Sequence, residues 1–322
     1  MKYPDEFINQ IICGDCLEVM SYIPDNSINL IIADPPYNIK KADWDKIPNY
    51  IEWLGNRIKG MERVLKDNGS FYLFHNDFLQ MVEIQNWINQ NSRFVFKSLI
   101  TVDKLDNSYI KDKYGSQNHF RNYLNLAEYI LFYTFQDETG LTTVMLDLNN
   151  FTSLRQYFKN YQIALGLTKK QIIEKIGQCA DHCFRWNSSQ WDLPTKETYE
   201  LLDKIPLKYK FVRREYEDLR RKYEDLRYTF NKKDGLKNIW AYHFKKDKQY
   251  SHPTQKPYQL IKDIILNSSN ENDLILDPFI GTGTTAVACQ ELNRNYIGIE
   301  NKLEYVNIAR KRVNATPEPL FI

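Results

Sequence analysis

A carboxylate, two prolines and a tyrosine stand in a row at Asp34-Pro35-Pro36-Tyr37, directly after an apolar run. An exocyclic amino nitrogen on a nucleobase is a poor nucleophile, because its lone pair is delocalised into the ring. The carboxylate of Asp34 and the backbone carbonyl of Pro35 could accept both N–H hydrogens and favour a pyramidal, more nucleophilic nitrogen. Successive prolines hold that carbonyl rigidly and bring no competing backbone donors. Tyr37 offers a flat face on which an extruded base could stack, a contact worth roughly 1–3 kcal/mol per base.

A second candidate site is the glycine-rich turn Gly281-Thr282-Gly283-Thr284-Thr285-Ala286, which follows the apolar run LILD. It fits the G-x-G-x-x-A pattern, in which glycine permits a tight turn and the close approach of a ligand to the backbone. The next apolar run ends at Glu300, whose carboxylate can accept hydrogen bonds from both hydroxyls of a ribose. Together these features predict a nucleoside site, although the turn taken alone would also fit a nicotinamide cofactor.

The elements that must position these residues are those of an α/β fold. Apolar, β-branched runs at 8–13 and 28–33 predict buried parallel strands with a helix between them, which puts Asp34 at a carboxyl strand end. We expect an amphipathic helix from residue 49 to a stop at Gly69, followed by strands at 70–75 and 127–135. Only two further strands, at 273–277 and 295–300, follow the middle of the chain. Two strands cannot complete a doubly wound sheet, so both ends of the chain must share one.

The middle of the chain differs in character, since strands are hard to find there while polar helices and aromatic residues dominate. We predict catalytic segments at 1–140 and 249–322 and a mainly helical insert at 141–248. Thr168 with Gln171 predicts a capping box, and Thr195 the start of another short helix, so that the two helices resemble a helix-turn-helix. The repeat EYEDLRR-KYEDLRY places an apolar seam from Val212 to Phe230 on one long helix. Fewer than three heptads rarely make a free coiled coil, so we expect this helix to pack on its own protein.

Charge and composition narrow the class of protein. The 322 residues carry a net charge of +2, but the segment from Lys204 to Lys248 holds fifteen Lys/Arg against seven Asp/Glu, a balance of +8 that leaves the remainder at −6. Such a basic, aromatic-rich segment predicts contact with a polyanion. The chain has no stretch of about 18 apolar residues and no signal-like start, which predicts a cytoplasmic protein with no membrane partner. An odd number of cysteines, five, favours reduced thiols.

In their order along the chain, these motifs resemble the amino-group DNA methyltransferases of the circularly permuted β group. In that family D-P-P-Y comes first, a target recognition domain follows, and a D-P-F-x-G-[ST]-G-T-T cofactor loop lies near the C-terminus. Here these are Asp34 to Tyr37, residues 141–248 and Asp277 to Thr285. Gly14-Asp15 and the run HPTQKP at 252–257 extend the resemblance, which covers residues 1–135 and 238–322 and is poor within the insert.

The resemblance implies a class I methyltransferase fold, which is Rossmann-like and doubly wound, with a mostly parallel seven-stranded sheet. It implies S-adenosylmethionine as cofactor, double-stranded DNA as partner, and direct methyl transfer to N6 of a flipped-out adenine without a covalent enzyme intermediate or a metal. The catalytic residues would be Asp34, Pro35, Pro36 and Tyr37. The residues implied to bind the cofactor are Asp15, Cys16, Asp34, Thr254, Gln255, Lys256, Asp277, Pro278, Phe279, Gly281, Thr282, Gly283, Thr284, Thr285, Glu300 and Asn301. The expected DNA contacts are Lys40, Lys41, Lys232, Lys233 and Lys237.

Several alternatives stay open. Cytosine N4 presents the same chemical problem as adenine N6, but an aspartate at position 34 favours adenine in this family, where serine is commoner for cytosine. The absence of a cysteine beside Pro36 disfavours attack at cytosine C5. A DNA-binding regulator with the same fold and no turnover is a further alternative. The residues also leave open whether this protein has a cognate restriction endonuclease as a partner and whether this protein forms a homodimer.

Three other groups of residues have simpler explanations. Cys13 with Cys16, and Cys179 with the nearby His182 and Cys183, have spacings conceivable for zinc, but buried strand and helix positions explain the first pair. In the strand at 127–135 and the segment before it, Arg121 and Glu128 are expected to support the sheet and not to act in catalysis.

Overall fold

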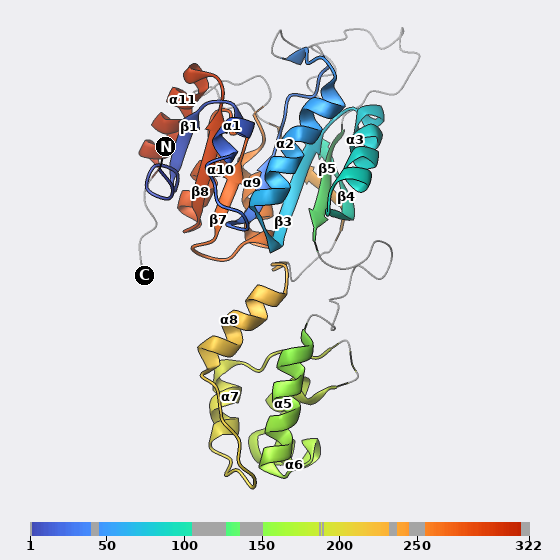
Figure 1. The fold of residues 1–322 in the computed structure, drawn as a ribbon, viewed down its shortest axis with the longest axis vertical. Helices are drawn as coiled ribbons and strands as arrows, with labels where there is room; N and C mark the ends of the chain where they lie inside the picture. Colours follow the sequence, from blue (N-terminus) through green and yellow to red (C-terminus); the bar gives the residue numbers. More distant parts are fainter. Residues whose placement is uncertain are drawn as a thin grey trace. The chain divides into compact units, whose positions relative to one another are not determined.

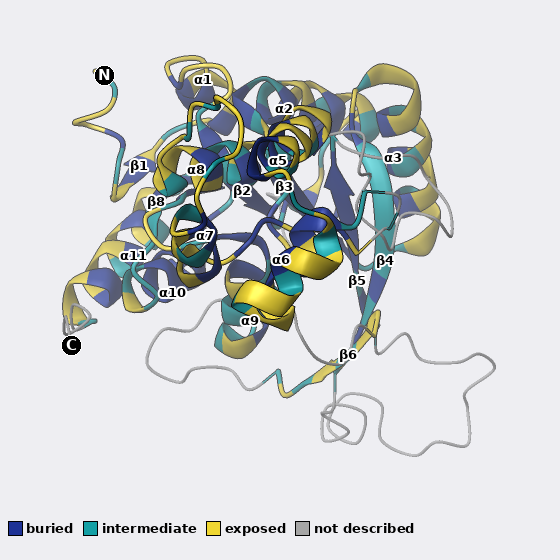
Figure 2. Cartoon of the chain, turned by 90° about the horizontal axis from the view of Figure 1, so that it is seen from below, coloured by how far each residue is buried: buried dark blue, intermediate teal, exposed yellow. Residues whose placement is uncertain are grey.

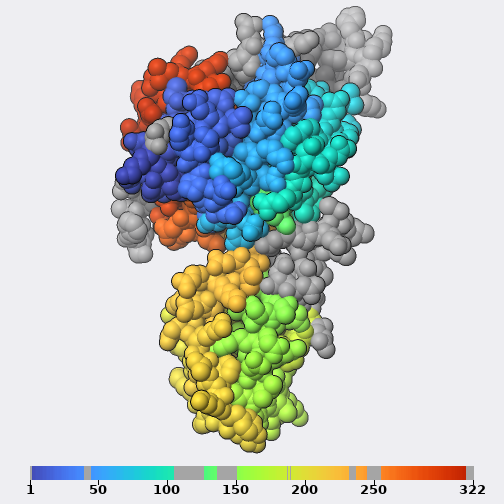
Figure 3. All heavy atoms as spheres, viewed as in Figure 1, coloured from blue at the N-terminus to red at the C-terminus, as the bar shows by residue number. Residues whose placement is uncertain are grey.

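The computed structural model of this protein describes residues 2–39, 45–104, 127–135, 151–186, 188, 190–231, 237–244 and 255–316. The chain divides into two compact units, one made of Met1–Gln136 with Thr229–Ile322 and the other of Asp137–Tyr228 (Figure 1). Segments from both ends of the chain therefore build the larger unit, and Figure 3 shows them together on its surface. Among the described helices, none combines the length and the apolar character that crossing a membrane requires.

The larger unit is built on one sheet, in which eight strands are described, in the order β1-β8-β7-β2-β3-β5-β4-β6. Strand β5 is antiparallel to both β3 and β4, and the remaining pairs are parallel. Strands from the C-terminal end lie between two strands from the N-terminal end, which confirms the shared, mostly parallel sheet. The bounds are β1 Gln10–Cys13, β2 Ile28–Ala33, β3 Leu65–His75, β4 Val95–Lys104, β5 Ala127–Thr134, β6 Ile239–Tyr242, β7 Leu274–Asp277 and β8 Asn295–Glu300.

Helices cover both faces of the sheet (Figure 2). One group consists of α1 Cys16–Met20, α2 Tyr50–Val64 and α3 Phe78–Asn91, and the other of α9 Tyr258–Ser268, α10 Thr284–Glu291 and α11 Leu303–Ala315. Successive side chains of a strand point to opposite faces, so a strand covered on both sides is apolar throughout. Ile31 and Ala33 of β2 accordingly join the core beneath α1–α3, while Leu30 and Ile32 are equally buried but stand outside that cluster.

Two elements differ from the sequence-based expectation. The helix predicted to reach Gly69 ends at Val64, because Leu65 is extended, buried and paired with Ile28 of β2. The register then shifts, so that Leu30 pairs with Ser70, and the polar residues between Leu65 and Ser70 belong to an irregular stretch of β3. The expected seven strands also become eight, since β6 pairs with the outer edge of β4. Its four residues lie in a polar, basic stretch without a long apolar run.

The smaller unit is helical wherever the structure describes regular elements, with a core of its own. Its helices are α5 Thr152–Leu165, α6 Lys169–Ile176, α7 Lys196–Asp203 and α8 Tyr216–Leu226, with short 3-10 helices at Gln178–Ala180 and His182–Phe184. The capping box of Thr168 and Gln171 is present, and Thr195 caps α7 as predicted. The segment between α6 and α7 is too long for a helix-turn-helix, whose turn has about three or four residues, so that resemblance was wrong.

Helix α8 is shorter than the repeat in its sequence suggests. Leu219 and Tyr223 are buried in the core of the smaller unit, which confirms that the seam packs on its own protein. The ends of the predicted seam lie outside the helix, because the backbone is extended at Glu215 and Arg227, and Val212 is exposed.

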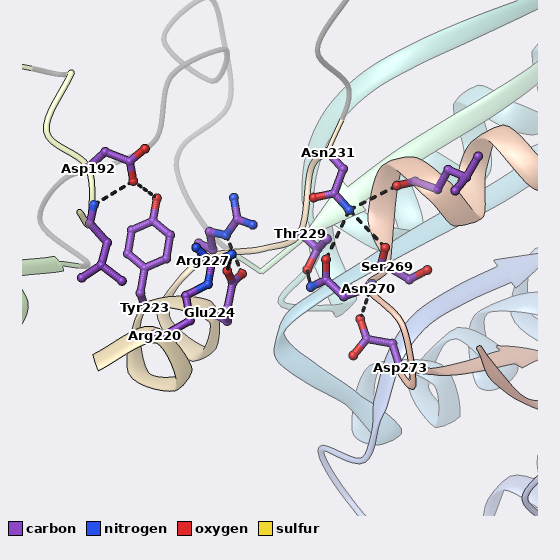
Figure 4. A network of polar contacts seen from close by, with 12 residues as sticks. Asp192, Arg220, Tyr223, Glu224, Arg227, Thr229, Asn231, Ser269, Asn270 and Asp273 are labelled. Atoms are coloured by element: carbon purple, nitrogen blue, oxygen red, sulfur yellow. Dashed lines mark hydrogen bonds and ion pairs between the residues drawn. The ribbon is translucent and has the colours of Figure 1, made fainter. Parts of the chain in front are cut away.

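The chain re-enters the larger unit at Thr229, so the smaller unit ends at Tyr228, twenty residues before the predicted end of the insert at 248. The amide of Asn231 donates hydrogen bonds to the carbonyls of Leu266 and Ser269 and to Asn270 Oδ1, over distances of 3.1–3.3 Å (Figure 4). The backbone N–H of Asn231 also donates to the carbonyl of Asn267 at 2.7 Å. These contacts tie residues 229–231 to the end of α9, so the end of the smaller unit precedes the basic stretch at 232–248.

Candidate active site

Four acidic residues mark the carboxyl ends of neighbouring strands in the order β1, β8, β7 and β2. Asp15 follows β1, Glu300 and Asp277 end β8 and β7, and Asp34 follows β2. All four line one cavity of the larger unit. Open α/β sheets place ligands at this edge, because loops diverge there and leave a crevice.

The Asp34 carboxylate accepts a hydrogen bond on each oxygen. Tyr37 Oη donates to Oδ1 at 2.6 Å, and Lys256 Nζ lies 2.7 Å from Oδ2. Burial alone would lower the pKa of Lys256, but the Asp34 and Glu128 carboxylates outweigh it and raise that pKa. Asp34 of the D-P-P-Y motif and Lys256 of the run HPTQKP are far apart in the sequence, and they meet in one ion pair. Gln255, next to this lysine, donates to Thr284 Oγ1 at 3.5 Å.

The Tyr37 ring is largely covered, with 6% of the residue exposed. Its centroid lies 4.8 Å from that of His75 at the end of β3, and Lys256 Nζ lies 5.1 Å above it. Burial and the Asp34 carboxylate raise the pKa of Tyr37, so its hydroxyl stays protonated and donates. Burial lowers the pKa of His75 to about 4, so this imidazole is neutral. A base could stack on Tyr37 only after part of this cover has moved, and the stacking role stays a prediction.

Polar contacts fix the loop that follows Pro35 and Pro36. Tyr50 of α2 donates to the carbonyl of Pro36 at 2.7 Å, next to the Pro35 carbonyl that is predicted to face the substrate. Asn38 has a left-handed backbone, with φ 55°, and its N–H donates to Asp45 Oδ1 at 2.7 Å. Asp45, which no motif predicts, thus closes this loop from a buried position.

The glycine-rich turn is organised by two acidic residues. Asp277 accepts hydrogen bonds from Phe279 N at 3.0 Å and Thr285 Oγ1 at 2.5 Å, and burial raises its pKa to about 7. Glu300 accepts from Gly281 N at 3.2 Å, and burial raises its pKa as well. Gly281 is left-handed, with φ 53°, and a Cβ added there would meet no atom closer than 4.0 Å. The turn therefore presents an open backbone face at Gly281.

Gly283 lies where two helices pack closely. It does not appear among the described residues that line the cavity, and a Cβ added there would lie 2.9 Å from Ala309 Cβ in α11. Its φ of 86° also disfavours any other residue. Gly283 therefore lets α10 and α11 approach each other, and its predicted contact with the cofactor stays a prediction.

Asp15 caps α1, since its carboxylate accepts from Leu17 N at 2.9 Å, and it pairs with Arg57 at 2.5 Å. The Arg57 guanidinium lies 3.8 Å from the ring centroid of Trp53, whose centroid is 6.2 Å from that of Phe279. Cys16 lines the same part of the cavity, and burial raises its pKa to about 12, so its thiol stays protonated. This end of the cavity combines flat apolar surfaces with one paired charge.

Comparison with known proteins identifies the family to which a chain with these site residues belongs. The family model described as "DNA methylase", which unites N6 and N4 enzymes, matches residues 28–311, a span that includes both Asp34 and the glycine-rich turn. The chain belongs to the N6/N4 DNA methylase family.

Curated relatives of this N6/N4 methylase extend over nearly the whole chain. Type II methyltransferase M.BglII of Bacillus subtilis is 26% identical over 322 residues, covering 98% of this chain and 72% of the relative. DNA adenine methyltransferase YhdJ of Escherichia coli (strain K12) is 28% identical over 323 residues, covering 97% and 85%. The methylase is thus a DNA methyltransferase.

Solved structures resemble the methylase in fold. The cytosine-N4-specific PvuII DNA methyltransferase matches with a TM-score of 0.56 and 15% identity, over 94% of this chain and 85% of that one. The M1.HpyAVI–SAM complex matches with a TM-score of 0.51 and 22% identity, over 94% and 98%. At these identities the likeness concerns the α/β fold with its mostly parallel sheet, which confirms the predicted fold class.

The described part of the methylase brings most predicted site residues together. The predicted residues that line the cavity are Asp15, Cys16, Asp34, Pro35, Pro36, Tyr37, Gln255, Lys256, Asp277, Pro278, Phe279, Gly281, Thr282, Thr284, Thr285, Glu300 and Asn301. Lys40, Lys41, Lys232, Lys233 and Thr254 lie outside the described residues, while Lys237 is described and exposed. Within the described ranges, no three His, Cys, Asp or Glu side chains form a group that could hold a metal ion.

Sequence reasoning missed four residues of the methylase's site. Trp53, Arg57 and Glu128 contact predicted residues, and Asp45 holds the loop that follows Pro36. Trp53 and Arg57 lie on α2, where their spacing of four residues is what an amphipathic helix would show in any case. Glu128 is the second residue of a strand and was read as a support of the sheet. Nothing in their local sequence separates these residues from structural ones.

Proposed function

We propose that this methylase transfers a methyl group from S-adenosylmethionine to N6 of an adenine flipped out of DNA. The observation that carries the proposal is the position of Asp34, which shares one cavity with Asp277, Glu300 and the open backbone at Gly281. A carboxylate at the reacting end and a nucleoside pocket at the other suit an amino-group acceptor and a nucleoside-containing donor. An aspartate in D-P-P-Y favours adenine, and YhdJ, a relative over 97% of this chain, is named a DNA adenine methyltransferase.

The cavity fits S-adenosylmethionine by the chemistry of its lining. Glu300 is suited to accept the ribose hydroxyls, and Trp53 with Phe279 offers flat surfaces for the adenine ring. Gly281 has room on the side where a Cβ would stand. Asp15 and Gln255 supply further polar groups at the cavity wall. When bound, S-adenosylmethionine supplies an electrophilic methyl group carried by a sulfonium.

Asp34 is the residue that acts on the substrate amine. An ionised carboxylate has about four lone-pair sites, so the two contacts from Tyr37 and Lys256 leave room for an amine N–H. The Pro35 carbonyl would accept the second N–H, and both acceptors stabilise positive charge that develops on the nitrogen. Such fixed dipoles and charges need no reorganisation during the reaction, which lowers the barrier.

The smaller unit is proposed to recognise the target sequence, because it has its own core and lies outside the family's catalytic motifs. The basic residues that follow it, among them exposed Lys237, are proposed to contact DNA phosphates. Phosphate contacts position a protein on DNA, and base contacts specify the site.

Expression in a host without DNA methylation, followed by genome-wide mapping of modified bases, tests this function. N6-methyladenine in one short sequence context is the expected result. N4-methylcytosine in its place would assign the enzyme to the other branch of the family. An unmodified genome with intact cofactor and DNA binding would favour a non-catalytic regulator.

A further inference from the structure

Four charged side chains of alternating sign form a line that starts at the candidate catalytic carboxylate. Asp34 Oδ2 is 2.7 Å from Lys256 Nζ, which is 3.5 Å from Glu128 Oε2, and Glu128 Oε1 is 2.9 Å from Lys104 Nζ. The two inner members are the most buried, with 5% of the Lys256 side chain and 9% of the Glu128 side chain exposed. We propose that Glu128 is a positioning residue, which acts on Asp34 through Lys256.

The backbone around Glu128 suits such a role. Glu128 is in β5 and pairs with Val102 of β4, and Lys104 is the last residue of β4. Both side chains are therefore anchored on adjacent strands of the sheet, which hold a side chain more precisely than a loop does. Lys256 comes from the segment just before α9 and has no such support from its own backbone. Glu128 supplies that support through its ion pair with Lys256.

Electrostatics keeps the line charged. Burial would raise the pKa of Glu128, but the Lys256 and Lys104 ammonium groups outweigh it and lower that pKa. The same Glu128 carboxylate contributes, after Asp34, to raising the pKa of Lys256 against its burial. Two carboxylates and two ammonium groups sum to zero, so the line brings no net charge into the interior. Removing one inner member would leave a buried charge without its counter-charge, which is costly.

The consequence for the reaction rests on the proposed function. As positive charge develops on the substrate amine beside Asp34, the nearby Lys256 ammonium repels it. Glu128 offsets this repulsion while holding Lys256 in place to orient Asp34. Loss of the Glu128 charge should therefore slow methyl transfer more than it weakens binding of DNA or cofactor.

If Glu128 had only a structural role, removing any similarly buried and paired carboxylate should have the same effect on the reaction. The chain offers a matched control for this alternative. Glu62 on α2 has a similarly buried side chain, 11% exposed, and pairs with Lys59 and Arg93, each at 3.2 Å. It does not appear among the residues described as lining the cavity. Glu62→Gln therefore removes a buried carboxylate with two cationic partners without touching the proposed mechanism.

The test compares Glu128→Gln with Glu62→Gln in the full chain, by single-turnover methyl transfer at saturating DNA and S-adenosylmethionine, on the base that the wild type modifies. Glu128→Gln should slow transfer by about tenfold or more while both dissociation constants stay within about threefold, whereas Glu62→Gln should keep the wild-type rate. Glu128→Asp, which keeps the charge, should recover most of the lost rate. Thermal unfolding of each variant shows that the compared proteins are folded.

A Glu128→Gln rate within about twofold of wild type would overturn the proposal. So would an equal slowing by Glu62→Gln, or a Glu128→Asp variant as slow as Glu128→Gln. Should Glu128→Gln fail to fold, the double variant Lys104→Gln Glu128→Gln removes one charge of each sign and is held to the same criteria. A wild type that methylates cytosine N4 contradicts the proposed adenine specificity but leaves this comparison intact.

Discussion

The carboxylate of Asp34 is held from two sides before any substrate arrives. Tyr37 and Lys256 each contact one of its oxygens, which gives the proposed acceptor for the substrate amine a fixed direction. Preorganisation of this kind contributes mainly to the transition state, because the amine gains its positive charge only during the reaction.

Replacing Asp34 with Ala should therefore abolish methylation or reduce it by at least about a hundredfold, while DNA and cofactor binding remain measurable. Single-turnover kinetics with separate binding titrations would check this split. Near-normal turnover in the variant would rule out the proposed role of Asp34.

Asp277 makes a second residue-level prediction, about stability and pH. Burial raises its pKa to about 7 in the folded protein, well above the ordinary aspartate value in the unfolded chain. A raised folded pKa stabilises the protein below the unfolded pKa, and this contribution is lost as pH rises through the folded pKa. The unfolding free energy of wild type relative to Asp277→Asn should thus fall between about pH 4 and 7, by up to about 4 kcal/mol. Denaturant titrations of both proteins across that range measure the difference, and a pH-independent difference would show that folding does not raise the pKa of Asp277.

The residues of the site were predictable where a contiguous motif carries them. Asp34, Lys256 and Glu300 stand in runs whose pattern implies chemistry, and the structure brings them to one cavity. Arg57 and Glu128 come from other elements, and only three-dimensional contact reveals what they touch. Charged residues also occur on helices and strands for structural reasons alone, such as solvation of an exposed face. The local sequence therefore cannot distinguish a charged residue of the site from a structural one.

At the scale of elements, the glycine-rich turn shows two glycines with different tasks. Gly281 faces the cavity, whereas Gly283 lies against Ala309 of α11. Gly283→Ala should lower thermal stability clearly, because it adds a close contact to a strained left-handed backbone. Gly281→Ala, strained but without a clash, should be less destabilising and should weaken S-adenosylmethionine binding more.

Calorimetric binding and thermal unfolding of both variants separate these effects. The opposite ranking, with Gly283→Ala the weaker binder and the more stable protein, would indicate that the cofactor contacts Gly283 and not Gly281.

Element prediction succeeded for short segments rich in apolar residues. Strands β2 (INLIIA), β7 (LILD) and β8 (NYIGIE) each contain three or more apolar residues within four to six positions. The start of β3 could not be predicted, because Leu65 pairs with Ile28 across an irregular stretch that contains polar residues and Gly69. Strand β6 is set by its pairing with β4, a long-range contact that four residues of local sequence do not encode.

At the scale of the whole molecule, the two ends of the chain form one sheet and the middle forms a helical unit of its own. The interruption was predictable from the return of α/β character after the middle of the chain. Its end was not, since Thr229 to Asn231 join the larger unit through polar contacts to α9 that have no signature in the sequence.

The basic stretch after the smaller unit makes a prediction about DNA affinity and salt. Phosphate contacts release counterions, so the log-log slope of affinity against salt is about −0.9 per neutralised phosphate on duplex DNA. Replacing Lys232, Lys233 and Lys237 with Gln should weaken binding to all duplexes and flatten the slope by up to about 2.7, while the methylated sequence stays the same. Lys237→Gln alone should flatten it by about a third as much. Unchanged slopes would mean that these lysines do not face DNA.

The identity of the methylated nucleoside shows most directly whether this cavity transfers a methyl group to N6 of adenine. Duplex DNA incubated with the purified protein and S-adenosylmethionine labelled in its methyl group should, after digestion to nucleosides, yield the label in N6-methyl-2′-deoxyadenosine. Label in N4-methyl-2′-deoxycytidine, or no labelled nucleoside from a folded protein that binds both ligands, would contradict transfer to N6 of adenine.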